Sequence, residues 1–129
     1  MQQFHPHPYQ QAGINAILEK PGVALWMEMG LGKTVVTLTA IDQLIYDRLE
    51  ISRVLIVAPK KVAEATWQDE AAKWGHLQHL RISTVLGTEK QRKAALAVPA
   101  DIYIINRDNV PWLVHTLGRS WNFDMVVGR

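Results

Sequence analysis

Six residues near the start of the chain, Met29 to Thr34, have the types and spacing of a phosphate-binding loop. Gly30 and Gly32 let the backbone turn tightly and point N–H groups at a phosphate. The amine of Lys33 can reach the outer phosphates of a nucleotide, and the hydroxyl of Thr34 suits a ligand position of Mg²⁺. The pattern therefore predicts a site for a nucleotide and its magnesium ion.

The segments on either side can hold this loop in place. Val23–Trp26 is a short apolar run that predicts a buried strand, and 35–46 has helical spacing. The positive end of the helix dipole would then point at the phosphates. The strict loop pattern has glycine where this chain has Met27, so a glycine turn that only joins strand to helix is the alternative. Gly-Lys-Thr in register between strand and helix favours the phosphate loop.

Farther along the chain, short apolar runs alternate with segments of helical period. Strands are predicted at 53–58, 82–86, 101–105 and 123–127, and helices at 9–18, 62–74, 88–97 and 110–117. Thr88 and Gln91 have capping-box spacing, Asp108 can cap the last helix, and Gly75 suits a left-handed helix end. Nearly continuous apolar strands between helices indicate an α/β fold, a three-layer P-loop NTPase-like domain with a mostly parallel sheet.

Composition limits the classes that remain. The chain has 129 residues, 48% of them hydrophobic, which suits one domain or part of one. A formal net charge of +2 is too small to indicate nucleic-acid binding by itself. No cysteine is present, so disulfides and thiolate metal sites are excluded. Without a recognisable export signal or a long apolar run, a cytoplasmic location is the simplest expectation.

Four separate pieces of sequence occur in an order typical of one family. They are Pro8-Tyr9-Gln10, the loop at 29–34, Val57-Ala58-Pro59-Lys60, and the pair Trp67 and Trp74. Together they resemble the first RecA-like domain of superfamily-two helicases, specifically the Snf-type translocating ATPases in their bacterial and phage forms. The resemblance covers residues 9–127. It implies a RecA-like fold, ATP and Mg²⁺ as cofactors, and double-stranded DNA as the partner of the full-length protein.

The resemblance also implies roles for individual residues. Gln10 matches a glutamine whose amide recognises adenine, since an amide donates and accepts at once. Thr34 would hold Mg²⁺ through the nucleotide, and Met27 is no objection because the family does not need glycine there. The nucleotide site implied in this way consists of Gln10, Glu28, Met29, Gly30, Leu31, Gly32, Lys33 and Thr34.

Three basic residues match segments that touch the nucleic-acid backbone in the family. Lys60 and Lys61 follow the second strand, and Arg107 follows the fourth, although Ile105-Asn106-Arg107-Asp108 departs from the usual threonine-rich pattern. Loops at the carboxyl ends of parallel strands face the ligand crevice, where cations can neutralise phosphates.

Other candidate residues receive a structural interpretation. Trp67 and Trp74 lie seven apart on one helical face, so we expect core packing and not base stacking. His76 and His79 have metal-like spacing, but no further ligand is near in sequence, and we expect no metal site. The basic run 90–93 is expected to be a solvated helix face.

The family's next element, an acidic Asp-Glu pair after the fifth strand, is not found in this sequence, which has Gly128-Arg129 there. That pair would bind Mg²⁺ and position the attacking water. We therefore expect residues 1–129 to be the amino-terminal portion of an ATP-binding domain, without catalytic residues of its own and inactive alone. In RecA-like sheets the strand beside the phosphate-loop strand also comes later, so Val23–Trp26 is expected to have a vacant edge. Such an edge invites a strand-exchanged or edge-paired homodimer.

Two other classes remain open. A non-catalytic module that binds nucleotide or DNA would share the same loop and strand ends. A small-molecule kinase could use the same loop, but Gln10 and Ala58-Pro59-Lys60 would then be unexplained coincidences.

Overall fold

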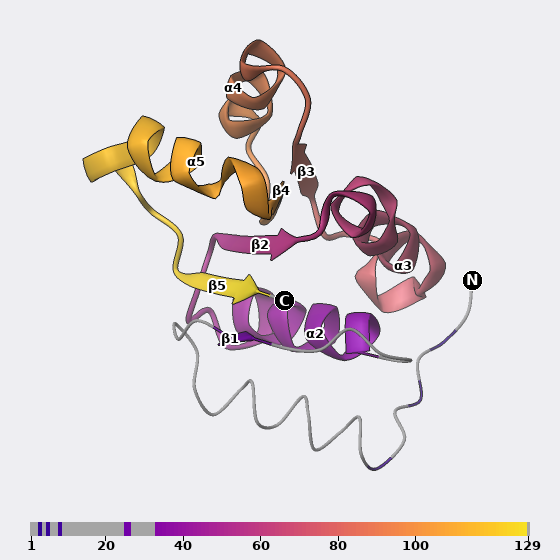
Figure 1. Ribbon diagram of the computed structural model, residues 1–129. Helices are drawn as coiled ribbons and strands as arrows, with labels where there is room; N and C mark the ends of the chain where they lie inside the picture. The colour runs from indigo at the N-terminus through magenta and orange to yellow at the C-terminus, as the bar shows by residue number, and fades with distance from the viewer. Residues whose placement is uncertain (1–2, 4, 6–7, 9–24, 27–32, 129) are drawn as a thin grey trace.

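A parallel sheet of five strands forms the centre of the described part of the chain (Figure 1). The computed structural model describes residues 3, 5, 8, 25–26 and 33–128. The strand order is β1-β5-β2-β4-β3, and every pairing between neighbours is parallel. The strands are β1 (Leu25–Trp26), β2 (Val54–Ala58), β3 (Ile82–Val85), β4 (Ile102–Asn106) and β5 (Met125–Gly128).

Helices cover both faces of this sheet, which confirms the predicted α/β fold with three layers. One hydrophobic core joins the sheet to α2 and α3, and a second joins it to α4 and α5. None of the helices in the described residues combines the length and hydropathy that crossing a membrane requires. The helices are α2 (Lys33–Asp42), α3 (Trp67–Lys73), α4 (Glu89–Ala97) and α5 (Val110–Leu117).

Strand β2 shows why the apolar runs are continuous. Val54, Ile56 and Ala58 belong to the core with α2 and α3, whereas Leu55 and Val57 belong to the core with α4 and α5. Because side chains alternate between the faces of a sheet and both faces are covered, every position of the strand is apolar. For β2 to β5, the predicted strands match the observed ones to within about two residues at each end, a normal uncertainty for boundaries.

Helix α2 is buried around most of its circumference. Leu38, Ala40 and Ile41 are fully inaccessible, and the polar side chains of Thr37 and Thr39 are also buried. A helix without a polar face must lie inside the protein. Its last turn widens into a π-helical turn, Gln43–Asp47, which still buries Leu44 and Ile45.

Of the three predicted helix caps, those at Gly75 and Asp108 are wrong, and the capping box that begins at Thr88 is confirmed. Gly75 is not left-handed: α3 ends with Trp74 extended, and Gly75 begins a 3-10 turn. Instead the amide of Gln78 donates to the carbonyls of Ala71 (3.1 Å) and Ala72 (2.7 Å), satisfying groups that a glycine cap would have served.

Asp108 does not cap α5, because it lies inside the 3-10 turn Arg107–Asn109 that precedes the helix. The capping box of α4 is confirmed. The Gln91 N–H donates to Thr88 Oγ1 at 3.2 Å, and the Thr88 N–H donates to Gln91 Oε1 at 2.8 Å.

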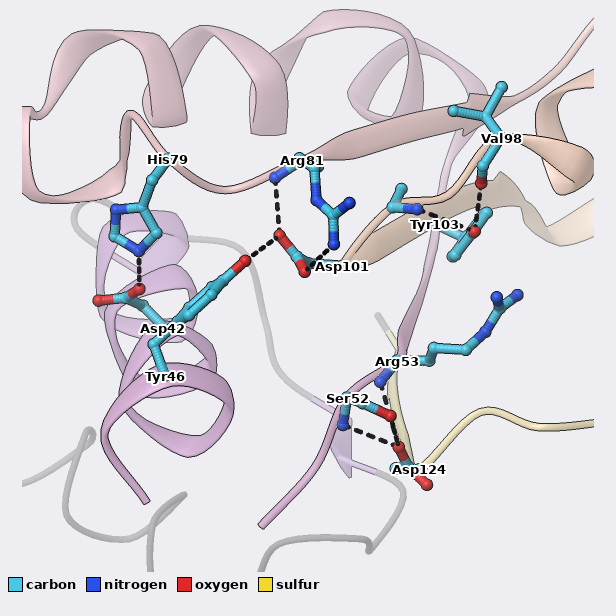
Figure 2. A network of polar contacts seen from close by, with 11 residues as sticks. Asp42, Tyr46, Ser52, Arg53, His79, Arg81, Val98, Asp101, Tyr103 and Asp124 are labelled. Atoms are coloured by element: carbon cyan, nitrogen blue, oxygen red, sulfur yellow. Dashed lines mark hydrogen bonds and ion pairs between the residues drawn. The ribbon is translucent and has the colours of Figure 1, made fainter. Parts of the chain in front are cut away.

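Two aspartates fasten the amino ends of the strands (Figure 2). Asp101, just before β4, accepts hydrogen bonds from the Arg81 N–H (2.9 Å) and the Tyr46 hydroxyl (2.8 Å). Asp124, just before β5, accepts from the Ser52 N–H at 2.9 Å. Each carboxylate thereby joins its own strand to the start of a neighbouring one.

Strand β1 pairs directly with β5, in the register Leu25 with Val127 and Trp26 with Gly128. This corrects the expectation that the strand beside β1 is missing from the chain, because β5 supplies it. Among the described strands β1 remains at the edge of the sheet, so the side of β1 that faces away from β5 has no strand paired to it there.

Candidate functional site

The carboxyl ends of four strands lie together at one edge of the sheet. The strand registers pair Ala58 with Asn106, Val57 with Gly128, and Trp26 with Gly128. In open parallel sheets, ligands bind in the crevice outside this edge. The candidate site is therefore built from the segments that leave β1, β2 and β4.

The predicted phosphate loop connects the end of β1 to the start of α2. Strand β1 and helix α2 lie on either side of it in the chain, and Lys33 is the first residue of α2. Thr34, the second residue, is 6% exposed. The side chain of Lys33 and all other predicted nucleotide-site residues lie outside the described part of the structure: Gln10, Glu28, Met29, Gly30, Leu31 and Gly32.

The three predicted nucleic-acid residues reach the same edge. Lys60 and Lys61 are exposed and begin the helical segment after β2, whereas Arg107 is exposed in the turn after β4. Because β2 and β4 are neighbours in register, these cations follow adjacent strand ends. Three positive charges on one edge can meet successive phosphates of a nucleic-acid backbone.

The turn that contains Arg107 is held by its own polar contacts. The amide of Asn109 donates to Asn106 Oδ1 at 2.6 Å, and the Val110 N–H donates to the Arg107 carbonyl. Asn106 is buried at the end of β4. Arg107 is therefore presented by a short, hydrogen-bonded turn that runs directly into α5.

The interpretation of residues 90–93 as a solvated face is wrong for Arg92. Its guanidinium lies 4.4 Å from the ring centroid of Trp112, and its Nη1 donates to the Gly87 carbonyl at 2.7 Å. The Trp112 Nε1 donates in turn to Glu89 Oε1 at 3.1 Å, and this bond lowers the pKa of Glu89. The cluster of Glu89, Arg92 and Trp112 could not be predicted from the sequence, because α4 and α5 meet only in the tertiary structure. Lys90 and Lys93 are exposed, as predicted.

Both histidines contact α2. The His76 Nε2 lies 2.8 Å from Thr39 Oγ1, and His79 forms an ion pair with Asp42. Burial raises the pKa of Asp42 despite the opposing effect of His79, and burial lowers the pKa of His76. Within the described residues, no three His, Cys, Asp or Glu side chains are grouped so as to hold a metal ion.

The two tryptophans pack as predicted. Trp67 is 2% exposed in the core beneath α2 and α3, and the partly buried Trp74 packs against that core. Trp67 is too deeply buried to stack on a base, because stacking needs an exposed ring face.

Comparison with known proteins adds independent findings. A family model described as the SNF2-related domain matches residues 9–127. The putative protein p41 of Acyrthosiphon pisum secondary endosymbiont phage 1 is 41% identical over 128 residues, covering 98% of this chain and 28% of p41. The bifunctional helicase and thymine dioxygenase JBP2 of Leishmania infantum is 29% identical over 144 residues, covering 95% of this chain and 13% of JBP2.

A solved structure shares the fold. The Sulfolobus solfataricus SWI2/SNF2 ATPase core in complex with dsDNA superimposes with a TM-score of 0.60 at 19% sequence identity. The match covers 99% of this chain and 34% of that core. The chain thus spans about a third or less of the length of each of these proteins.

Proposed function

Because this chain belongs to the SNF2-related domain family, we propose that it is the ATP-binding part of a Snf-type DNA translocase. Residues 1–129 form the amino-terminal portion of the first RecA-like domain in this proposal. The observation that supports it most is the carboxyl edge of the sheet. There α2 begins after β1, and the exposed Lys60, Lys61 and Arg107 follow the neighbouring strands β2 and β4.

In this proposal the nucleotide lies against the amino end of α2. The loop glycines would turn N–H groups toward the phosphates, and Lys33 would neutralise the outer ones. Gln10 would hold the adenine, and Glu28, Met29 and Leu31 would complete the loop. The negative charge of the phosphates suits a helix that begins at this edge with no acidic residue in its first turn.

The residues present fit nucleotide-bound Mg²⁺. Thr34 offers a hydroxyl oxygen in the first turn of α2, and oxygen is the ligand atom that Mg²⁺ prefers. The ion, when bound, would neutralise charge on the phosphates. No apolar strand of this sequence is followed by an Asp-Glu pair, so residues 1–129 alone are proposed to bind ATP without hydrolysing it.

The nucleic acid in this proposal is double-stranded DNA, held through its phosphates by Lys60, Lys61 and Arg107. The solved SWI2/SNF2 core was determined with dsDNA, and the JBP2 relative is named a helicase, which supports this choice. We place the protein in the cytoplasm, in keeping with a sequence that has no cysteine.

Two measurements test the proposal. Residues 1–129 should bind a fluorescent ATP analogue with Mg²⁺, and Lys33→Ala should weaken that binding by about a hundredfold, because a charged phosphate contact is lost. Equal binding by both proteins would show that the loop does not hold phosphate. The full-length protein should hydrolyse ATP faster when double-stranded DNA is added. Hydrolysis that double-stranded DNA does not stimulate would contradict the translocase proposal.

A further inference from the structure

A small surface cluster joins two loops at the carboxyl edge of the sheet. Glu89 begins α4 just after the loop that follows β3, and Trp112 lies in the first turn of α5, just after the turn that follows β4. The Trp112 Nε1 donates to Glu89 at 3.1 Å, and Arg92 stacks on the indole ring at 4.4 Å. We call Glu89, Arg92 and Trp112 the α4–α5 clamp.

The α4 side of the clamp is held rigidly. Arg92 Nη1 donates to the Gly87 carbonyl at 2.7 Å, and Gly87 has a φ of +90°, which residues with a Cβ rarely adopt. A Cβ at this position would lie 2.1 Å from Gln91 Oε1, the atom that accepts the Thr88 N–H in the capping box. The loop after β3 is thus fixed by its turn, its cap and the arginine.

The α5 side of the clamp leads directly to Arg107. The Val110 N–H donates to the Arg107 carbonyl, and Trp112 follows two residues later. Leu113 anchors the same helical turn in the core. Any movement of the first turn of α5 would therefore move the turn that presents Arg107.

The cluster contributes little to the fold by itself. The side chain of Glu89 is 61% exposed, and Arg92 and Trp112 are partly exposed. Cation–π contacts and hydrogen bonds in contact with water add little to the free energy of unfolding. Their effect on geometry can still be large, because holding a binding group in place avoids an entropy loss when the ligand binds.

We propose that Arg92 and Trp112 are positioning residues that hold the Arg107 turn against α4, so that Arg107 is preset to contact a DNA phosphate. The proposal rests on the DNA-binding role of Arg107 under the proposed function. Neither Arg92 nor Trp112 touches DNA in it. Lysine at 92 would keep the positive charge but could not stack flat on the indole while bonding Gly87.

The test is a double-mutant cycle for DNA affinity in the full-length protein. Binding of a fluorescein-labelled DNA duplex is measured over a series of NaCl concentrations for the wild type, Arg92→Lys, Arg107→Ala and the double variant. Arg107→Ala should reduce the slope of log K against log salt by about 0.9, the value for one phosphate. Arg92→Lys should weaken binding by about threefold to tenfold, and the double variant should bind no worse than Arg107→Ala alone.

Matched variants separate positioning from other effects. Lys90→Ala removes an exposed charge from the same helix without touching the clamp, and it should leave DNA affinity unchanged. Trp112→Phe keeps a ring for stacking but loses the bond to Glu89, so its effect should be smaller than that of Trp112→Leu. Binding of the ATP analogue should be the same in all of them, which also shows that each variant is folded.

The outcomes distinguish this inference from the proposed function. If Arg107→Ala changes neither DNA affinity nor the salt slope, the DNA-binding role of Arg107 fails, and the inference with it. If Arg107→Ala weakens binding but Arg92→Lys does not, only the positioning role is overturned. Additive losses in the double variant would also overturn it, because Arg92 would then act on DNA independently.

Discussion

Replacing Asp101 should destabilise the protein more than any other change to a polar residue at the amino edge of the sheet. Asp101 is only 3% exposed. Its carboxylate accepts hydrogen bonds from the Arg81 N–H (2.9 Å), the Arg81 Nη2 (3.2 Å) and the Tyr46 hydroxyl (2.8 Å). A hydrogen bond to a charged group contributes about 1.5–3 kcal/mol. The guanidinium contributes least, because the Arg81 side chain is 61% exposed and water screens it.

We therefore expect Asp101→Ala to lower the free energy of unfolding by about 3 kcal/mol at pH 7. Tyr46→Phe is the matched control, since it removes one donor and keeps the ring, and it should cost about 1 kcal/mol. Urea denaturation followed by tryptophan fluorescence measures both. A loss for Asp101→Ala no larger than that for Tyr46→Phe would refute the idea that the three contacts act together.

The pH dependence of the free energy of unfolding tests whether the negative charge of Asp101 is the source of this stabilisation. Burial alone would raise the pKa of Asp101, but hydrogen bonds from Arg81 and Tyr46 outweigh it and lower the pKa below its ordinary value. The stabilisation is then fully present above the unfolded-state pKa of about 4 and disappears as the pH falls through the lower folded-state pKa. The gap in stability between wild type and Asp101→Asn should narrow below about pH 4. A constant gap from neutral to acid pH would show that the charge is not its source.

Three further predictions concern the core, two glycines with positive φ, and the edge of the sheet. Trp67→Ala should lower the free energy of unfolding by about 3–5 kcal/mol in the same denaturation assay, because removing a fully packed ring leaves a cavity. A loss under about 1 kcal/mol would contradict the place of Trp67 in the core. Gly87→Ala should cost about 1–2 kcal/mol because of the positive φ and the contact with Gln91. Gly118→Ala is strained by its own φ of +48° but meets no other atom within 4 Å, so it should cost less in the same measurement. Residues 1–129 should self-associate in light scattering at high concentration, through the side of β1 that has no partner among the described strands. A monomer whose Leu25 and Trp26 amides are well protected from hydrogen exchange would count against that pairing.

Local sequence patterns predicted the elements well, because their causes are local. The short runs of branched apolar residues in β2 and β4 favour strands, and Thr88 with Gln91 caps a helix through contacts three residues apart. The burial of Trp67 followed from its spacing on one face of a helix. The succession of strand β1 and helix α2 at the candidate site was likewise predicted from the sequence.

Most of the contacts that the sequence did not predict join residues that are far apart in the chain and meet only in the tertiary structure. Asp124 binds Ser52 across 72 positions, and Arg92 meets Trp112 only because α4 and α5 share one face of the sheet. No pattern within either segment records such a partner. Gly75 failed as a cap for a different, local reason, since the side chain of Gln78 folds back over the end of α3 and donates to its carbonyls. The neighbour of β1 was also unpredictable, because register across a sheet is set by packing against both cores.

The position of β5 has a consequence for how the protein is made. The strand lies between β1 and β2, yet it is the last of the five to be synthesised. While the ribosome is still translating the earlier strands, β1 lacks the one partner that it has among the described strands, although α2 can already pack against β2. We therefore expect β1 to pair in the nascent chain only when residues 125–128 emerge, about a hundred residues after it.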